Sequence, residues 1–207
     1  MKNRIKHDLM DLMMIPGLSG HEDRVRRDLS GRLSAIGVES RSDRLGNLVA
    51  HFPGDGPRVM LFTHMDQLGF IVRQIEADGL IRLERLGGVP ERALAAQEVL
   101  ICVGEGLDVS GIIANKSHHA TTPSEKNQVV PYAELYVDTG LSSTSEVEAA
   151  GIRIGSPVVY APQALELGDS RICGTSIDDR AGCAVLLEVA RLLKNRTSGP
   201  PVDLAFT

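Results

Sequence analysis

The stretch Val59-Met60-Leu61-Phe62-Thr63-His64-Met65-Asp66 is an apolar, strand-like run that ends directly in a histidine and a carboxylate. A second such run, Ser170 to Gly174, leads through a short segment to Asp178-Asp179-Arg180. Functional groups of open α/β sheets collect at the carboxyl ends of strands, so both placements are typical of a site. Imidazole and carboxylate are good ligands for divalent metals, and a carboxylate two residues after a ligand histidine can hold its ring. The pattern therefore indicates a divalent-metal site.

Each half of this pattern also has a simpler interpretation. A His-x-Asp at the end of a strand is commonly a surface ion pair. An Asp-Asp-Arg before a helix is commonly an N-cap followed by a solvated arginine, because carboxylates favour helix N-termini. Spacing alone leaves these alternatives open.

Longer segments of the chain add a family resemblance. Four ordered motifs resemble those of the TET-type co-catalytic metallo-aminopeptidases, the glutamyl and leucyl aminopeptidases formerly described as endoglucanases or cellulases. The matching segments are Phe62 to Phe70, which is similar to "HMDEIGF", Ile177 to Cys183 with Leu186 to Glu188, which is similar to "DDRxGC…LLE", Leu135 to Gly140, and Gly151 to Val159. The resemblance covers essentially the whole chain.

The resemblance implies a two-metal hydrolase that removes N-terminal residues from peptides. It implies two divalent ions, with zinc or cobalt expected. His64 would bind one ion, Asp178 would bridge both, and Asp66 would act at the catalytic centre by orienting His64. Asp179 would follow Asp178 across a peptide bond that is cis in relatives.

One part of the family pattern has no counterpart in this sequence. In the family, a Glu-Glu pair follows the next strand, and a further Asp and a distant His complete the site. Here the corresponding strand, Val202 to Thr207, is the last stretch of the sequence. We therefore expect a C-terminally truncated relative that is inactive or nearly inactive alone. We also expect an unpaired sheet edge at this strand, with self-association or poor solubility as the consequence.

The order of predicted elements favours an α/β fold. We expect a partial mixed-sheet αβα metallopeptidase domain with an inserted small β-barrel or sandwich. The expected domain ranges are 1–68 for the first part of the catalytic domain, 69–157 for the β-rich insert, and 158–207 for the second part. The resemblance gives the insert a dimerisation role, so we expect a homo-oligomer that forms through residues 69–157.

Local signals place several elements within this scheme. Apolar residues at helical spacing predict helices near Ile5 to Met13 and Val25 to Ile36. Ser19 to Glu22 matches a capping box before the second of these. Val158 to Tyr160 is expected to return the chain to the α/β part. Val202 to Thr207 is expected to run parallel to the strand near Ile177, because a helix between two strands is typical of a βαβ unit.

Composition excludes several function classes. The net charge is −5 with no basic block, which argues against nucleic-acid partners and against an anionic membrane surface. Aromatic residues make up 3% of the chain and there is no Trp, so Leu, Val, Ile and Ala must form the core. Three cysteines without a Cys-x-x-Cys pair predict free buried thiols in a reducing compartment. With no signal peptide or membrane-spanning run in the sequence, we expect a cytoplasmic protein.

Two other readings of the function stay open. A non-catalytic relative could retain only the oligomerising insert. Polysaccharide hydrolysis would need two carboxylates that flank a sugar bond, usually with aromatic platforms, and a chain without Trp and with four Phe offers few of these. His21 and the adjacent His118 and His119 are further metal-ligand candidates, for which exposed surface positions are the simpler interpretation.

Overall fold

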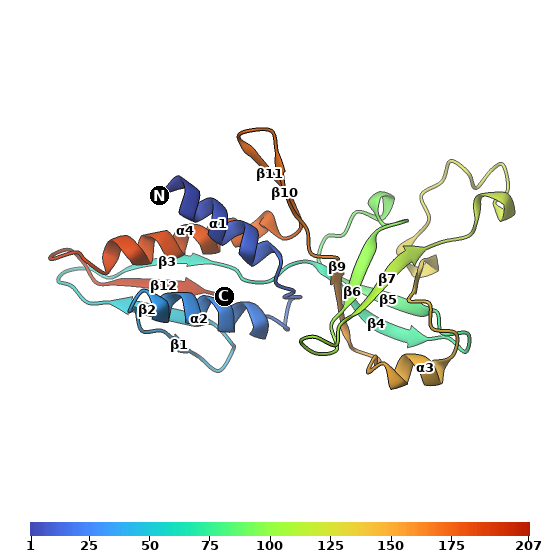
Figure 1. The fold of residues 1–207 in the computed structure, drawn as a ribbon, viewed down its shortest axis with the longest axis horizontal. Coiled ribbons are helices and arrows are strands. Elements are labelled where there is room, and N and C mark those ends of the chain that lie inside the picture. Colours follow the sequence, from blue (N-terminus) through green and yellow to red (C-terminus); the bar gives the residue numbers. More distant parts are fainter. The chain divides into compact units, whose positions relative to one another are not determined.

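The computed structural model describes all of residues 1–207, which form two compact units. One unit combines Met1–Gln67 with Pro162–Thr207, and the other is Leu68–Ala161 (Figure 1). The chain thus has a mixed α/β fold. None of its helices is both long enough and apolar enough to cross a membrane.

The first unit is built on a four-stranded mixed sheet with strand order β1-β2-β12-β3. The central strand β12 pairs with β2 in antiparallel fashion and with β3 in parallel. All five residues of β12 are buried, as expected for a strand with neighbours on both sides. The bounds are β1 Arg41–Ser42, β2 Leu48–Phe52, β3 Val59–Thr63 and β12 Val202–Phe206.

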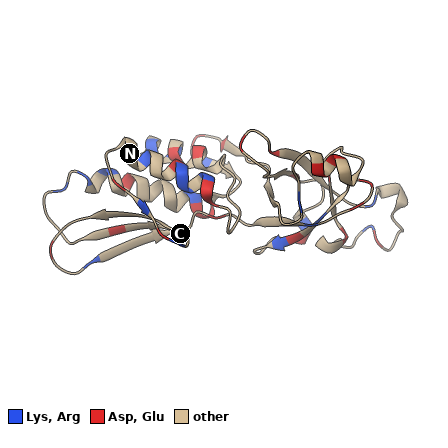
Figure 2. Ribbon diagram, turned by 90° about the horizontal axis from the view of Figure 1, so that it is seen from below, with Lys and Arg blue, Asp and Glu red and all other residues tan.

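The three helices of this unit lie on one side of the sheet (Figure 2). They are α1 Lys2–Met13, α2 Asp23–Ala35 and α4 Ile177–Leu193. Their apolar stripes, together with Leu48, Leu204 and Phe206, form one hydrophobic core. Within these residues the unit therefore has two layers, one of helices and one of sheet.

The ends of α2 show where local sequence signals succeed and fail. Gly37 has φ +70°, and the Gly37 and Val38 N–H groups donate to the Ser34 and Leu33 carbonyls, which is a Schellman C-terminus. The capping box predicted for Ser19 is wrong. The N-cap is Glu22, because a turn closed by the His21 N–H and the Leu18 carbonyl delays the helix until Asp23.

The predicted partner of the last strand is also wrong. β11 (Arg171–Gly174) pairs only with β10 (Ala164–Leu167), in a separate antiparallel hairpin. The parallel neighbour of β12 is instead β3. Burial explains the difference, because every residue of β12 is buried whereas β11 alternates between exposed and half-buried positions.

The second unit is a closed six-stranded barrel with strand order β4-β5-β8-β7-β6-β9. Antiparallel pairing of β6 and β9 helps to close it, so Val158 to Tyr160 lie in the barrel rather than in the returning segment that the sequence predicts. The bounds are β4 Gly69–Ile75, β5 Ile81–Leu86, β6 Glu98–Ile101, β7 Val109–Ala114, β8 Tyr136–Asp138 and β9 Pro157–Tyr160, with helix α3 at Thr144–Ala149. Short 3-10 turns occupy Glu91–Ala93, His118–Ala120 and Tyr132–Glu134.

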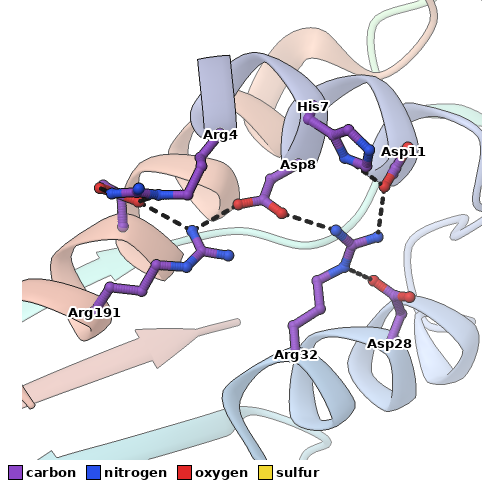
Figure 3. A network of polar contacts seen from close by, with 8 residues as sticks. Arg4, His7, Asp8, Asp11, Asp28, Arg32 and Arg191 are labelled. Carbon is purple, nitrogen blue, oxygen red and sulfur yellow. Dashed lines mark hydrogen bonds and ion pairs between the residues drawn. The ribbon is translucent and has the colours of Figure 1, made fainter. Parts of the chain in front are cut away.

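A network of charged side chains joins the three helices of the first unit (Figure 3). Glu188 of α4 is only 3% exposed and accepts hydrogen bonds from Arg4 of α1 and Arg191 of α4, each at 3.1 Å. Asp8 of α1 accepts from Arg191 at 2.7 Å and from Arg32 of α2 at 2.9 Å. Because each buried carboxylate has two cationic partners, the network satisfies the charges that the packed helices cover.

We expect Glu188→Gln to lower the free energy of unfolding by about 1–3 kcal/mol, because it weakens the charge-assisted hydrogen bonds that Arg4 and Arg191 donate to a buried group. The hydrogen bond from Arg4 holds the pKa of Glu188 below its ordinary value of 4.5 in the folded chain. This contribution is therefore present above that value and is lost as pH falls through the folded pKa. Urea titrations at neutral and acidic pH would measure both effects.

The matched control is Glu166→Gln, which removes the exposed partner of Lys6. Because such surface pairs contribute about 0–1 kcal/mol, this variant should unfold nearly like the parental protein. Equal losses in the two variants would contradict a special role for the network.

The sequence predicts an unpaired sheet edge at the last strand, and this prediction is wrong, because β12 has a neighbour on both sides. The edge strand with exposed apolar side chains is β3. Val59, Met60, Leu61 and Phe62 are all exposed there, and Phe62 is 75% exposed. An unpaired edge strand with exposed apolar side chains is a ready template for pairing with another chain. The β3 edge is therefore a candidate surface for self-association.

We expect Met60→Lys to reduce self-association, because a charge on an edge strand opposes edge-to-edge pairing. Size-exclusion chromatography with light scattering would measure the mass over a range of concentrations. Leu45→Lys is the control, since Leu45 is an exposed apolar residue outside every strand. A parental protein that stays monomeric throughout would refute the prediction.

Candidate metal centre

His64 leaves the sheet at the end of β3, beside the end of β12. The Thr207 N–H donates to the Thr63 carbonyl at 2.9 Å, and the Met65 N–H donates to the Thr207 carbonyl at 2.6 Å. These bonds continue the parallel pairing past the last residue of either strand. The carboxyl ends of β3 and β12 thus lie together, and they hold the backbone on both sides of His64.

Asp178 lies at the irregular start of α4. Asp178 and Asp179 have non-helical backbone angles, and the peptide bond between them is cis, as the resemblance implied. The Asp179 carboxylate accepts the Gly182 N–H at 2.8 Å, so Asp179 caps the regular part of the helix. Asp178 is left just outside the helix, with its side chain 94% exposed.

The structure brings the three predicted site residues together. His64 Nε2 lies 3.1 Å from Asp178 Oδ1, although the two residues are 114 positions apart. His64 Nδ1 lies 2.9 Å from Asp66 Oδ1. A carboxylate can only accept from the ring, so a proton on Nδ1 leaves the lone pair of Nε2 facing a second carboxylate. Two acceptors at this distance require a positive charge, which either a second ring proton or a metal ion supplies.

The pKa of His64 reflects this environment. Burial acts to lower the pKa, but the carboxylates of Asp66 and Asp178 outweigh burial and raise it above its ordinary value. The same negative field that stabilises a protonated ring would stabilise a divalent cation. Metal and proton therefore compete for Nε2.

The His64–Asp178 pair fits part of a metal site. Two donor atoms that each lie about 2.1 Å from one ion can be at most about 4.2 Å apart, so a separation of 3.1 Å is compatible with a shared ion. The chain contains no group of three or more His, Cys, Asp or Glu side chains arranged to hold a metal. A catalytic zinc takes about three protein ligands, so the pair supplies some of the ligands such an ion needs.

Arg180 is buried rather than solvated, so the simple N-cap interpretation of Asp-Asp-Arg is wrong for its third residue. Its Nη1 donates to the Leu12 carbonyl at 2.9 Å, while Nε and Nη2 have no hydrogen-bond partner. Burial lowers the pKa of Arg180 to about 10. A Cβ at Gly17 would lie 2.7 Å from Nη2, so a glycine at this position leaves room for the guanidinium.

Two further residues beside the site were missed by sequence reasoning. Thr63 Oγ1 donates to Asp179 Oδ2 at 2.5 Å, and Cys183 Sγ donates to the His64 carbonyl at 3.4 Å. Burial raises the pKa of Cys183 to about 11, so its thiol stays protonated. Both residues pack the His64 segment against α4. No signal in the sequence marked them beyond their position within the two motifs.

Two other candidate histidines, His118 and His119, belong to the second unit, whereas His64 and Asp178 belong to the first. His118 and His119 contact each other edge to face, with ring centroids 5.8 Å apart, and Lys126 Nζ is 3.4 Å from His118. A neighbouring ammonium does not favour a cation there. His51, which the sequence analysis did not single out, lies 2.6 Å from the buried carboxylate of Asp203. The three cysteines are free, and Cys173 is exposed rather than buried as predicted.

Comparisons with known proteins identify the family of the chain. A model of the M42 glutamyl aminopeptidase family matches residues 46–207. The chain belongs to this family. Among M42 relatives, a lysyl aminopeptidase from Pyrococcus furiosus is 35% identical over 86% of this chain and 52% of its own length. The chain spans about half the length of the curated relatives it matches.

Solved structures of similar M42 proteins share the fold. An aminopeptidase from the archaeon Desulfurococcus kamchatkensis is 30% identical with a TM-score of 0.89, over 100% of this chain and 56% of that one. The TET1 peptidase from Pyrococcus horikoshii, which can assemble into a tetrahedron or a large octahedral shell, is 26% identical with a TM-score of 0.89. That match covers 98% of this chain and 60% of that one. The resemblance to TET-type aminopeptidases is thereby confirmed.

We expect Gly182→Ala to destabilise the chain by about 1–3 kcal/mol, because a Cβ there would overlap Thr63 Oγ1 and the Asp179 carboxylate. Thermal unfolding would measure the loss. The control is Gly31→Ala in α2, where a Cβ meets nothing within 4 Å. That change should stabilise the helix by about 0.5–1 kcal/mol. A neutral Gly182→Ala variant would contradict the tight packing described here.

Proposed function

We propose that this chain forms part of a metal-dependent aminopeptidase that hydrolyses N-terminal residues from peptides. The observation that carries the proposal is the 3.1 Å approach of His64 Nε2 to Asp178 Oδ1, a separation that a shared proton or a shared metal ion can bridge. Membership of the M42 family supports the same chemistry.

The residues have distinct roles in this proposal. His64 would hold one ion through Nε2, and Asp178 would be shared between two ions. Asp66 accepts a hydrogen bond from the Nδ1–H of His64, which fixes the ring and leaves the lone pair of Nε2 available to a metal ion. When bound, two divalent ions, zinc or cobalt, would polarise the scissile carbonyl and lower the pKa of a bound water.

We further propose that this chain alone hydrolyses peptides slowly or not at all. A catalytic zinc takes about three protein ligands, and His64 and Asp178 supply only two. No Glu-Glu pair like that of the family occurs in the sequence. A general base of that kind would have to take the proton from the attacking water.

Homo-oligomerisation through residues 69–157 is a separate part of the proposal. These residues include most of the barrel, and the assembling TET1 peptidase of Pyrococcus horikoshii supports an oligomer. Self-association at the free β3 edge would be a different interface, and variants confined to either unit distinguish the two.

We expect Co²⁺ to bind the parental chain, and His64→Ala and Asp178→Asn to weaken binding more than the roughly 10–100-fold loss typical of an outer partner. Asp66→Asn should fall within that outer-partner range. Titration of Co²⁺ absorption would measure each dissociation constant, with His118→Ala as the control. Hydrolysis of leucyl- and glutamyl-p-nitroanilide with added Co²⁺ or Zn²⁺ would test the activity.

Two results would contradict the proposal. Equal Co²⁺ affinity in the parental protein and in His64→Ala would remove His64 from the site. Full aminopeptidase turnover by this chain, unaffected by Asp178→Asn, would show that the reaction uses other residues.

A further inference from the structure

The segments that carry His64 and Asp178 are linked by side-chain hydrogen bonds on both sides of the pair. On one side, Thr63 donates to Asp179, the residues just before His64 and just after Asp178. On the other side, Ser176 Oγ donates to Gln67 Oε1 at 3.1 Å. The exposed Asp178 side chain therefore depends for its position on a backbone held at both ends.

Gln67 is well placed to act as the second link. It is only 6% exposed, so its amide needs partners within the protein. Its backbone N–H donates to the Gly17 carbonyl at 2.8 Å, and it forms an isolated parallel bridge with Leu18. The residue is thus anchored to the loop after α1, while its side chain reaches the segment before Asp178.

Ser176 adopts a backbone conformation that needs support. Its φ of +59° and ψ of +22° lie in the left-handed region, which is uncommon for residues other than glycine. Such conformations persist where the surroundings hold them. The hydrogen bond to Gln67 is the side-chain contact that holds this turn, which directs the chain into Asp178.

We propose that Gln67 is a positioning residue that, by holding Ser176, sets the distance between His64 and Asp178 before an ion binds. The inference rests on the proposed metal binding by these two residues. Preorganised ligands bind more tightly, because less conformational freedom is lost on binding. Gln67 itself contacts neither of the two ligand side chains through any hydrogen bond in the structure.

Three variants separate the hydrogen bond from general packing. Gln67→Leu removes the acceptor and keeps a buried side chain of similar size. Ser176→Gly removes the hydroxyl, and glycine adopts a positive φ without strain. Gln67→Glu is the conservative variant, because a carboxylate can still accept from Ser176.

Titration of Co²⁺ into each variant of the 207-residue chain is the first measurement. Gln67→Leu and Ser176→Gly should each raise the dissociation constant about tenfold. The double variant should be no weaker than the weaker single variant, because both changes remove the same bond. Gln67→Glu should bind as tightly as the parental protein, or more tightly.

The melting temperature of the metal-free variants separates positioning from stability. Ser176→Gly relieves a left-handed serine but leaves the buried Gln67 Oε1 without its donor, so the two effects on stability oppose each other. The variant should therefore melt close to the parental temperature and still bind Co²⁺ more weakly. A residue that served only stability could not give that combination. Dissociation constants within twofold of the parental value in Gln67→Leu and Ser176→Gly would overturn the proposal.

Amide hydrogen exchange of the metal-free proteins gives an independent test. Peptides that cover residues 174–179 should exchange faster in Gln67→Leu than in the parental protein or in Gln67→Glu. If the parental protein binds no Co²⁺, the proposed function fails. The hydrogen-exchange measurement then still tests whether Gln67 holds Ser176 in position. Unchanged exchange in Gln67→Leu, or equal acceleration in Gln67→Glu, would overturn it.

Discussion

The parallel pairing of β3 with β12 is the constraint on which the first unit depends. It places a fully buried strand between β2 and β3 and leaves one side of the sheet to pack against α1, α2 and α4. It also extends past the strand ends, where backbone hydrogen bonds between Thr63, Met65 and Thr207 fix the point at which His64 leaves the sheet. A change in the register of this pair would therefore move the His64 side chain as well as the core.

The buried charged side chains of the first unit differ in whether they have partners. On the helix layer, Asp8 and Glu188 each have two cationic partners, so their burial is compensated. Beneath the candidate centre, the guanidinium of Arg180 is fully buried with two nitrogens unpartnered. Burial of an unpaired cation is costly. Burial lowers the pKa of Arg180, whereas the negative charge of Asp66, a carboxylate of the candidate centre, acts to raise it. The buried guanidinium and this carboxylate therefore attract each other.

Much of this arrangement follows from the sequence, because local patterns encode local structure. Helical spacing predicted α1 and α2, and the order of elements predicted a small β-rich insert. Strand pairing partners do not follow, since periodicity shows which face of a strand is buried but not which strand lies beside it. This is why the positions of β9, β11 and β12 differed from expectation. The run before His64 has the apolar composition that is typical of a buried strand, yet its first four residues are exposed at a sheet edge.

The candidate centre shows the same division. Residue chemistry at strand ends, together with the family resemblance, indicated His64, Asp66 and Asp178, and the structure places them within hydrogen-bonding distance. The residues that hold them, Thr63, Gln67, Ser176 and Arg180, carry no such mark. Their roles depend on contacts between segments more than a hundred positions apart, which a single sequence does not reveal.

The second unit, Leu68–Ala161, is inserted in the sequence between His64 and Asp178. In terms of chain entropy, the whole barrel is one long loop whose two ends are held close together in the first unit. The entropy of closing such a loop grows only with the logarithm of its length, by about 0.6 kcal/mol for each doubling. The entropic cost of bringing His64 and Asp178 together is thus nearly independent of the size of the insertion, so an insert of a different length would change that cost little.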